Sequence, residues 1–247
     1  MKQYDIDLME KAGALTAQAF DYLEKFITPG ISTLDINTVM HEFVKMKGAI
    51  PAQLGFKGFP ASVTTSVNDC YCHGLPNSNP LKSGDIVTVD IALAMNGHYS
   101  DSARTYIIGK GDSESEELIR IAKKATNEGI KVIKPGTSIG DIGYSISKYV
   151  ENNGYYVFRE MDGHGIGLRL HQEPYIKPFG IKGEGYKLRE GECITVEPII
   201  SAASIDPVAR RIPNSNVLVY YSKQGFLSAY FEHTILVTNQ GYKILTA

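Results

Sequence analysis

The sequence predicts an α+β fold made of two similar halves, and the first observation behind this prediction is an internal duplication. PGISTLDI at residues 29–36 matches PGTSIGDI at residues 135–142 at five of eight positions. LKSGDIVTVD at residues 81–90 likewise matches LREGECITVE at residues 188–197, with nearly the same offset along the chain. Chance reuse of common Pro-Gly turns is the alternative explanation. Two matches at nearly one offset favour a true repeat.

Hydrophobic periodicity is the second observation, because each half reads as two helices followed by strands. We expect helices over residues 5–26, 33–47, 113–130 and 139–153. We expect strands over residues 61–68, 85–94, 98–108, 155–160, 192–200, 215–221 and 227–238. Ser32 or Thr33 is the expected N-cap of the second helix, and Ser113 with Glu116 is the expected capping box of the third.

No Ser/Gly-rich linker separates the two halves, which span about residues 1–110 and 111–247. We therefore expect a single domain over residues 1–247. Both halves would contribute to a central antiparallel sheet that helices cover on one side. The other face would then be concave near the pseudo-twofold axis.

Composition excludes several other classes of protein. The net charge of −2 gives no reason to expect a specific nucleic-acid partner. No apolar run reaches the roughly 20 residues of a membrane helix, and the acidic N-terminus does not read as a signal peptide. Cys70, Cys72 and Cys193 form no even set of disulfides, so we expect a cytoplasmic protein. The sequence shows no exposed apolar stripe that would require a partner protein, so we expect a monomer.

A predicted hairpin brings two acids together. Asn96-Gly97 favours a two-residue type I′ turn, which places Asp101 opposite Ala92 and makes Asp90 its diagonal neighbour on the same face. Two such acids repel each other unless a cation lies between them. Solvent-facing acids are the alternative, but the strand is otherwise apolar, and an acid in such a strand requires a partner.

Three further residues extend this acidic pair. Glu197 corresponds to Asp90 in the repeat, Glu232 lies in a third apolar stretch, and His164 lies among glycines that allow close approach. Four carboxylates and one imidazole form an oxygen-rich set that suits two divalent ions with shared carboxylates. Zinc-finger chemistry is excluded because thiolates with suitable spacing are missing.

Seven motifs follow one another along essentially the whole chain. They are Cys72-His73-Gly-Leu-Pro, Val89-Asp90, Ser100-Asp101, Gly163-His164-Gly-Ile-Gly, Leu170-His171-Gln-Glu-Pro, Val196-Glu197-Pro and Phe231-Glu232-His-Thr. Together they resemble those of type I methionine aminopeptidases. The resemblance implies the pita-bread fold and a catalytic role for the single domain.

The resemblance also implies a role for each metal-binding residue. Asp90 would be a terminal ligand of one ion, His164 and Glu197 would bind the other, and Asp101 and Glu232 would bridge both. A metal-bound hydroxide would attack the peptide carbonyl, and Glu197 would take part in proton transfer. The ligand set suits Mn²⁺, Fe²⁺, Co²⁺, Ni²⁺ or Zn²⁺.

Two further histidines gain catalytic roles from the resemblance. His73 would contact the scissile amide and shuttle protons, and His171 would stabilise the tetrahedral intermediate. A neutral histidine satisfied inside the core is the alternative for either residue. Strand alternation turns His233 away from the face of Glu232, and no pattern supports His98, which we expect at the surface.

The implied substrate pocket departs from the usual pattern of the family. The expected substrate-binding residues are His73, His171, Phe56, Phe59, Thr64, Leu170 and Leu218. Leu170 stands where bacterial members usually carry Phe, Leu218 replaces a Trp, and Tyr230 stands where Gln is common. The alternative is that the phenylalanines merely pack the core. We expect an apolar pocket that still suits methionine but has a changed shape.

The implied reaction is removal of the initiator methionine from nascent proteins and peptides with a small second residue. An Xaa-Pro peptidase or another aminopeptidase of the same fold is one alternative, and a peptide-binding relative without metal is another. Transient ribosome contact through Arg210 and Arg211 is conceivable for an enzyme that trims nascent chains. Solvated surface charge is the simpler explanation of that pair.

Overall fold

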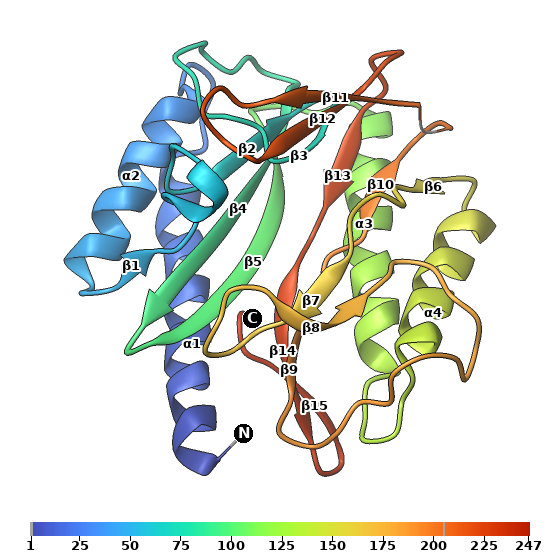
Figure 1. Cartoon of the computed structure of the whole chain (residues 1–247). Coiled ribbons are helices and arrows are strands. Elements are labelled where there is room, and N and C mark those ends of the chain that lie inside the picture. Colours follow the sequence, from blue (N-terminus) through green and yellow to red (C-terminus); the bar gives the residue numbers. More distant parts are fainter. Residues whose placement is uncertain (1, 205) are drawn as a thin grey trace.

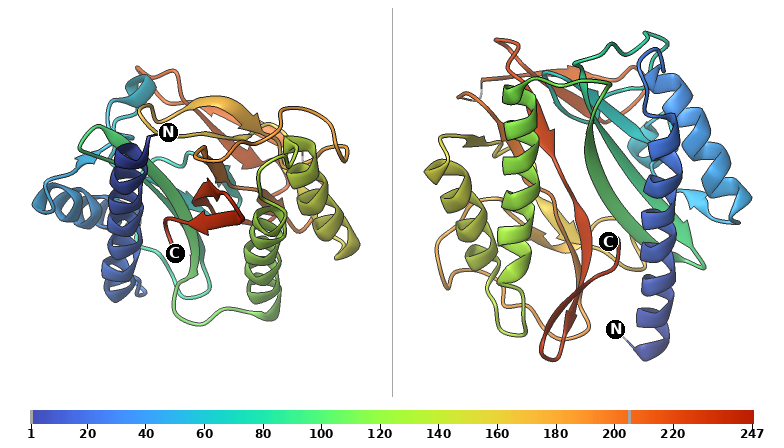
Figure 2. Two further views of the ribbon diagram at one scale, coloured as in Figure 1. Left: turned by 90° about the horizontal axis from the view of Figure 1, so that it is seen from below. Right: turned by 180° about the vertical axis from the view of Figure 1, so that it is seen from behind.

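Helices cover one face of the strands in the computed structural model, which describes residues 2–204 and 206–247 (Figure 1). The helical elements are α1 (Gln3–Leu23), η1 (Glu24–Phe26), α2 (Thr33–Met46), η2 (Phe56–Gly58), α3 (Ser113–Lys131) and α4 (Ile139–Asn152). Seen from below and from behind, α1 to α4 all lie on the same side of the strands (Figure 2). The α+β fold with one helix-covered face is therefore confirmed. None of the described helices is long and apolar enough to cross a membrane.

All described strands pair in antiparallel fashion, and they form four hydrogen-bonded sheets rather than one continuous sheet. One sheet has the order β1-β4-β2 with β5 beside β4, and a five-stranded sheet has the order β15-β14-β9-β7-β8. Two three-stranded sheets have the orders β13-β10-β6 and β11-β12-β3. The strands are β1 (Ile50–Pro51), β2 (Thr64–Val67), β3 (Cys70–Cys72), β4 (Ile86–Met95), β5 (His98–Ile107), β6 (Tyr156–Val157), β7 (Gly163–Gly165), β8 (Gln172–Ile176), β9 (Cys193–Val196), β10 (Ile199–Ser201), β11 (Pro207–Arg211), β12 (Leu218–Ser222), β13 (Ser228–Tyr230), β14 (His233–Thr238) and β15 (Gly241–Ile244).

The repeat found in the sequence corresponds to a repeated start of a helix. Ser32 caps α2 in a capping box with Asp35, and Ser138 caps α4 in the same way with Asp141. In each box the serine hydroxyl accepts from the backbone N–H of the aspartate, and the aspartate accepts from the backbone N–H of the serine. Ser32 is thus one of the two caps expected for α2.

The second repeated motif binds directly to the first in both halves. Leu81 N donates to Ile31 O, and Leu188 N donates to Thr137 O, each over 2.8 Å. Since the same backbone contact recurs at matched positions, the repeat is present in the structure as well as in the sequence.

The β4–β5 hairpin has the predicted register. Asn96 and Gly97 both have positive φ, as a type I′ turn requires, and Asp101 pairs with Ala92. Asp90 therefore lies diagonally from Asp101 on the same face of the sheet.

Two predicted strands are interrupted, and both interruptions fall at expected metal ligands. The stretch predicted over 192–200 breaks between β9 and β10 at Glu197 and Pro198, because proline has no N–H to donate to a ladder. The stretch predicted over 227–238 breaks between β13 and β14, where Glu232 forms an isolated bridge with Ala103 of β5. This bridge joins the strands of the two halves.

Other expectations differ locally from the structure. Only β6 forms within the strand predicted over 155–160. The N-cap of α3 is Asp112, which accepts from Ser115 N, so the predicted Ser113–Glu116 box is wrong. His98 is buried rather than exposed, because its Nε2 lies 3.2 Å from Asp5 at the start of α1.

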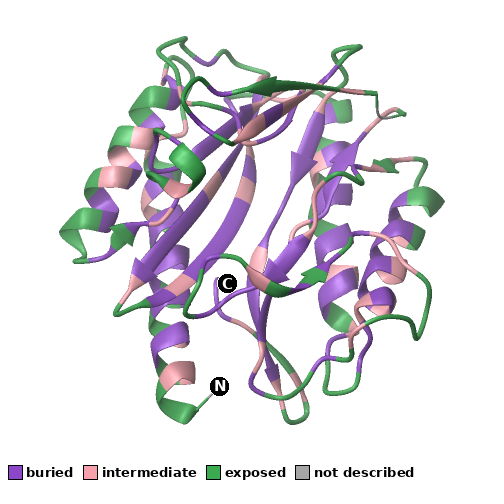
Figure 3. Cartoon of the chain, in the orientation of Figure 1, coloured by how far each residue is buried: buried purple, intermediate pink, exposed green. Residues whose placement is uncertain are grey.

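The core lies between the helices and the strands, as the burial pattern shows (Figure 3). One apolar cluster packs α1 and α2 against β4, with Phe20, Met40 and Val89 among its members. A second packs α3 and α4 against the sheet that contains β9 and β14. The strands are thus fixed from behind, and their other face is left for the site.

Candidate metal centre and substrate cavity

A cavity of about 380 Å³ gathers residues from both halves of the chain. All twelve residues singled out from the sequence line it: Phe56, Phe59, Thr64, His73, Asp90, Asp101, His164, Leu170, His171, Glu197, Leu218 and Glu232. Two of its contributing elements, η2 and β7, lie on the side away from α1 and α3 (Figure 2). The structure therefore brings every predicted site residue into one place.

The acids and His164 form overlapping groups with the spacing of metal ligands. Asp90, Asp101 and Glu232 offer ligand atoms within 4.8 Å of one another, and so do His164, Glu197 and Glu232. Glu232 belongs to both groups. A third group within the same spacing joins Asp101, His164 and His171.

Asp101 and Glu232 are buried carboxylates with oxygens that lack partners. Asp101 is 6% exposed and Glu232 is 1% exposed, and neither Asp101 Oδ1 nor Glu232 Oε1 has a hydrogen-bond partner in the described structure. Burial, reinforced by the neighbouring carboxylates, raises the pKa of both side chains well above their usual range. Such orphaned oxygens are costly, and a bound cation would offset this cost.

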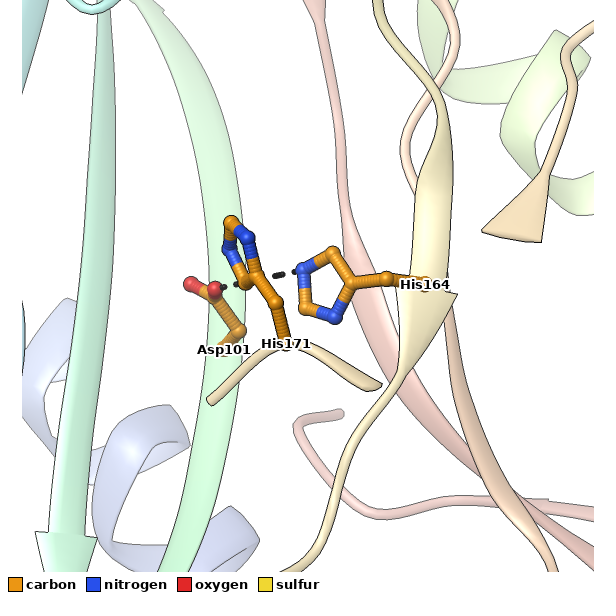
Figure 4. A group of neighbouring side chains, drawn as sticks. All are labelled: Asp101, His164 and His171. Atoms are coloured by element: carbon orange, nitrogen blue, oxygen red, sulfur yellow. Dashed lines mark ion pairs between the residues drawn. The ribbon is translucent and has the colours of Figure 1, made fainter. Parts of the chain in front are cut away.

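His164 is oriented so that one ring nitrogen faces Asp101 (Figure 4). Its Nδ1 donates to the carbonyl oxygen of Gly165 over 3.0 Å, which leaves Nε2 free as an acceptor. Nε2 lies 3.8 Å from Asp101 Oδ2 and 3.6 Å from Glu197 Oε1. Burial lowers the pKa of His164 to about 4, so the ring is neutral and can donate a lone pair to a metal.

Thr195 supports both His164 and Glu197. Its hydroxyl donates to Glu197 Oε1 over 2.7 Å and accepts from His164 N over 2.9 Å. Burial raises the pKa of Glu197 to about 8. A carboxylate with a pKa near neutrality is suited to proton transfer.

His171 and His73 stand at the wall of the same cavity. The ring centroid of His171 lies 4.0 Å from that of His164 and 5.0 Å from that of Phe56. Burial lowers the pKa of His171 to about 3, so this ring is neutral too. His73 has a positive φ of 59° directly after β3, and its Nδ1 donates to Leu218 O over 2.9 Å. Both rings therefore stand at the wall of the cavity that the acids also line.

His233, as predicted, has no part in the cavity lining. Its Nδ1 bonds to the hydroxyl of Thr246 at 2.9 Å near the end of the chain.

Several supporting residues were not singled out from the sequence. Gln53 Nε2 donates to Asp90 Oδ1 over 2.8 Å, and the Thr234 hydroxyl both donates to Asp101 O and accepts from Asp101 N. Tyr230 was noticed only as a departure from a family pattern, and its hydroxyl donates to Asp90 Oδ2. Ordinary Gln and Thr residues carry no signal in a single sequence. Only the fold reveals that they contact the acids.

The donor set fits divalent cations. Hard carboxylate oxygens with one neutral imidazole suit such ions. Asp101 and Glu232, which carry the orphaned oxygens, belong to the same ligand group. Cys70 and Cys72 are buried free thiols outside these groups. The clustered acids and histidines therefore support divalent-metal binding.

Comparisons with known proteins agree with this geometry. Residues 7–239 match the model of metallopeptidase family M24. The chain is 40% identical to a methionine aminopeptidase of Rickettsia prowazekii, over 98% of this chain and 92% of that protein. The crystal structure of methionine aminopeptidase from that organism superposes with a TM-score of 0.97 at 39% identity, covering 100% of this chain and 98% of the other.

A prolidase of Pyrococcus horikoshii has a TM-score of 0.76 at 24% identity, where all of this chain covers 62% of that one. This second likeness shows a common fold alone. The pita-bread fold expected from the motifs is thus confirmed, and the chain belongs to metallopeptidase family M24, as a member of its methionine aminopeptidase group.

Proposed function

We propose that the protein is a methionyl aminopeptidase that removes the initiator methionine from nascent proteins and peptides with a small second residue. The observation that carries this proposal is the pair of ligand groups that share Glu232 at a cavity partly lined by apolar side chains. The family relatives named as methionine aminopeptidases support it over nearly the whole chain.

We propose that two divalent ions bind, one on each side of Glu232. Asp90 would hold one ion, His164 and Glu197 would hold the other, and Asp101 and Glu232 would contact both. Asp101 shares one ligand group with Asp90 and another with His164, from which it lies 3.8 Å away, and this placement supports its bridging role. Bound ions of this kind polarise a peptide carbonyl and lower the pKa of an attacking water. Mn²⁺, Fe²⁺, Co²⁺, Ni²⁺ and Zn²⁺ all suit the ligands.

The protein's own side chains would move the protons. Glu197 would accept a proton from the attacking water and return it to the leaving amine. The rings of His171 and His73 would hydrogen-bond to the reacting peptide unit, with His171 stabilising the oxyanion. Their positions on the cavity wall beside the acids support these roles.

The pocket would receive the first side chain of the substrate. Phe56 and Phe59, from the turn around η2, share the cavity lining with Thr64 and two leucines, Leu170 and Leu218. Leucines in place of larger rings enlarge the pocket without making it polar. A flexible thioether fills an irregular apolar space well, so methionine remains the best-fitting residue.

We further propose one catalytic domain over residues 1–247, with halves of about 1–110 and 111–247, acting as a monomer in the cytoplasm. The shared bridge between Ala103 and Glu232 supports treating the halves as one unit. Arg210 and Arg211 are exposed on β11, where they would serve a transient ribosome contact.

Hydrolysis of Met-Ala, Leu-Ala and Ala-Ala peptides with metal-reconstituted protein tests the proposal. We expect the highest kcat/KM for the methionine peptide and no turnover after treatment with EDTA. A preference for Ala over Met would contradict the pocket assignment. Full activity in EDTA would contradict the metal chemistry, and the absence of turnover despite bound metal would favour a peptide-binding protein.

A further inference from the structure

The hydroxyl of Tyr230 connects the two halves of the chain at the metal centre. Tyr230 lies in β13 and is 2% exposed, and its hydroxyl donates to Asp90 Oδ2 over 3.3 Å. Asp90 lies in β4, in the other half of the repeat. The side chain thus reaches from one half to a proposed metal ligand in the other.

The Tyr230 side chain has little freedom to move. Its backbone N–H donates to the hydroxyl of Thr105, and that hydroxyl donates to Tyr230 O over 2.7 Å. Ile199 pairs with it across the β10–β13 ladder, and its ring belongs to a buried cluster with Tyr71 and Phe158. Because both backbone and ring are fixed, the hydroxyl is held in place before any metal binds.

Asp90 receives two further hydrogen bonds from uncharged groups. Gln53 Nε2 donates to Oδ1 over 2.8 Å, and the Thr64 hydroxyl donates to Oδ2 over 3.3 Å. An ionised carboxylate offers about four lone-pair directions. Three neutral donors therefore restrain the rotation of this carboxylate and leave one direction for a further ligand. Asp90 offers a ligand atom within 4.8 Å of those of Asp101 and Glu232. By contrast, Asp101 and Glu232 each keep an oxygen without a partner.

We propose that Tyr230 is a positioning residue that orients Asp90 toward the ion it shares with Asp101 and Glu232. This inference rests on the proposed metal-dependent function. Hydrogen bonds to the outer side of ligating carboxylates orient them and tune metal affinity, and their loss typically costs about 10- to 100-fold. The contact from β13 also makes correct orientation of Asp90 depend on docking of the two halves.

Manganese titration of the full chain, freed of metal with a chelator, tests this role by calorimetry. Asp90→Asn first identifies the binding event that depends on Asp90. Tyr230→Phe then removes only the hydroxyl. Tyr71→Phe is the matched control, because Tyr71 is fully buried in the same cluster and its hydroxyl has no partner in the described structure.

We expect Tyr230→Phe to weaken the Asp90-dependent event by about tenfold or more and to leave the other event within about twofold. Tyr71→Phe should leave both events unchanged, and the metal-free melting temperatures of the two variants should agree. Equal affinities of wild type and Tyr230→Phe for the Asp90-dependent ion would overturn the positioning role, as would equal weakening of both events. If the wild type bound no Mn²⁺ at all, the proposed function would fail together with this inference.

Discussion

Asp90 and Glu197 occupy the same place in the repeat, yet their surroundings differ. Asp90 lies inside the ten-residue strand β4 and accepts three hydrogen bonds from neutral donors. Glu197 follows β9 directly and precedes a proline, and it accepts one hydrogen bond from Thr195 while facing His164.

The difference shows how a duplicated framework can produce two unequal ligands. The repeat fixes the position of each acid within its half, whereas the neighbouring side chains determine its surroundings. Asp90 is held on its outer side and is suited to binding alone. Glu197 is less constrained and lies beside a neutral imidazole, and burial raises its pKa to about 8. In the proposed reaction, proton transfer at the attacking water would therefore fall to Glu197, in the second half.

Glu232→Gln should have the largest effect, because it removes the acid that the two proposed metal sites share. We expect both binding events to be severely weakened and kcat/KM to fall by on the order of 10³-fold, equivalent to about 4 kcal/mol of transition-state stabilisation. Calorimetry with Mn²⁺ and hydrolysis of a methionine peptide measure the two effects. Retention of one unperturbed ion would show that the two sides are independent.

The pH dependence of stability in the metal-free protein should next isolate the contribution of Glu197. Glu197 has an ordinary pKa of 4.5 that rises to about 8 in the folded state. The folded protein therefore holds an extra proton between these values, and its stability falls as pH rises through about 8. His164 acts in the opposite sense, since its pKa falls from 6.5 to about 4. Its contribution is complete above 6.5 and is lost as pH falls through about 4.

Melting temperatures in excess chelator measure this effect. We expect the melting temperature to decline between about pH 6 and pH 8.5. Glu197→Gln should make this decline shallower, and saturating Mn²⁺ should reverse it. A decline of the same slope in wild type and Glu197→Gln would show that the other carboxylates account for it.

The capping boxes should give the smallest effect and the closest match between the halves. Ser32→Ala and Ser138→Ala each remove the hydroxyl that accepts from an aspartate N–H at the start of a helix. We expect each substitution to lower the free energy of unfolding by about 1 kcal/mol, with activity unchanged. Urea unfolding measures both losses. A difference of several fold between them would mean that the repeated contacts are not energetically equivalent.

The sequence predicted those parts of the fold that depend on local chemistry. The register of β4 and β5 followed from the turn at Asn96 and Gly97. The helices followed from apolar spacing, and the cap of α2 at Ser32 was one of the two expected. It did not predict β7 and β8 beside His164, since a short glycine-rich strand shows no alternation. It also missed β11, whose exposed residues carry no apolar pattern.

The candidate site was predictable because acids in apolar strands are costly without partners. The residues that orient those acids could not be predicted in the same way. Thr195 lies two residues before Glu197, but Gln53 and Tyr230 reach Asp90 from distant parts of the chain. Such contacts are properties of the packed structure, and an isolated sequence gives no sign of them.

Anomalous diffraction from crystals of the Mn²⁺-loaded protein tests the central claim most directly. We expect two peaks, one on each side of Glu232. One peak should lie near Asp90 and the other near His164 and Glu197. The carboxylates of Asp101 and Glu232 should each contact both ions. A single peak, or peaks outside this group of five residues, would contradict the account.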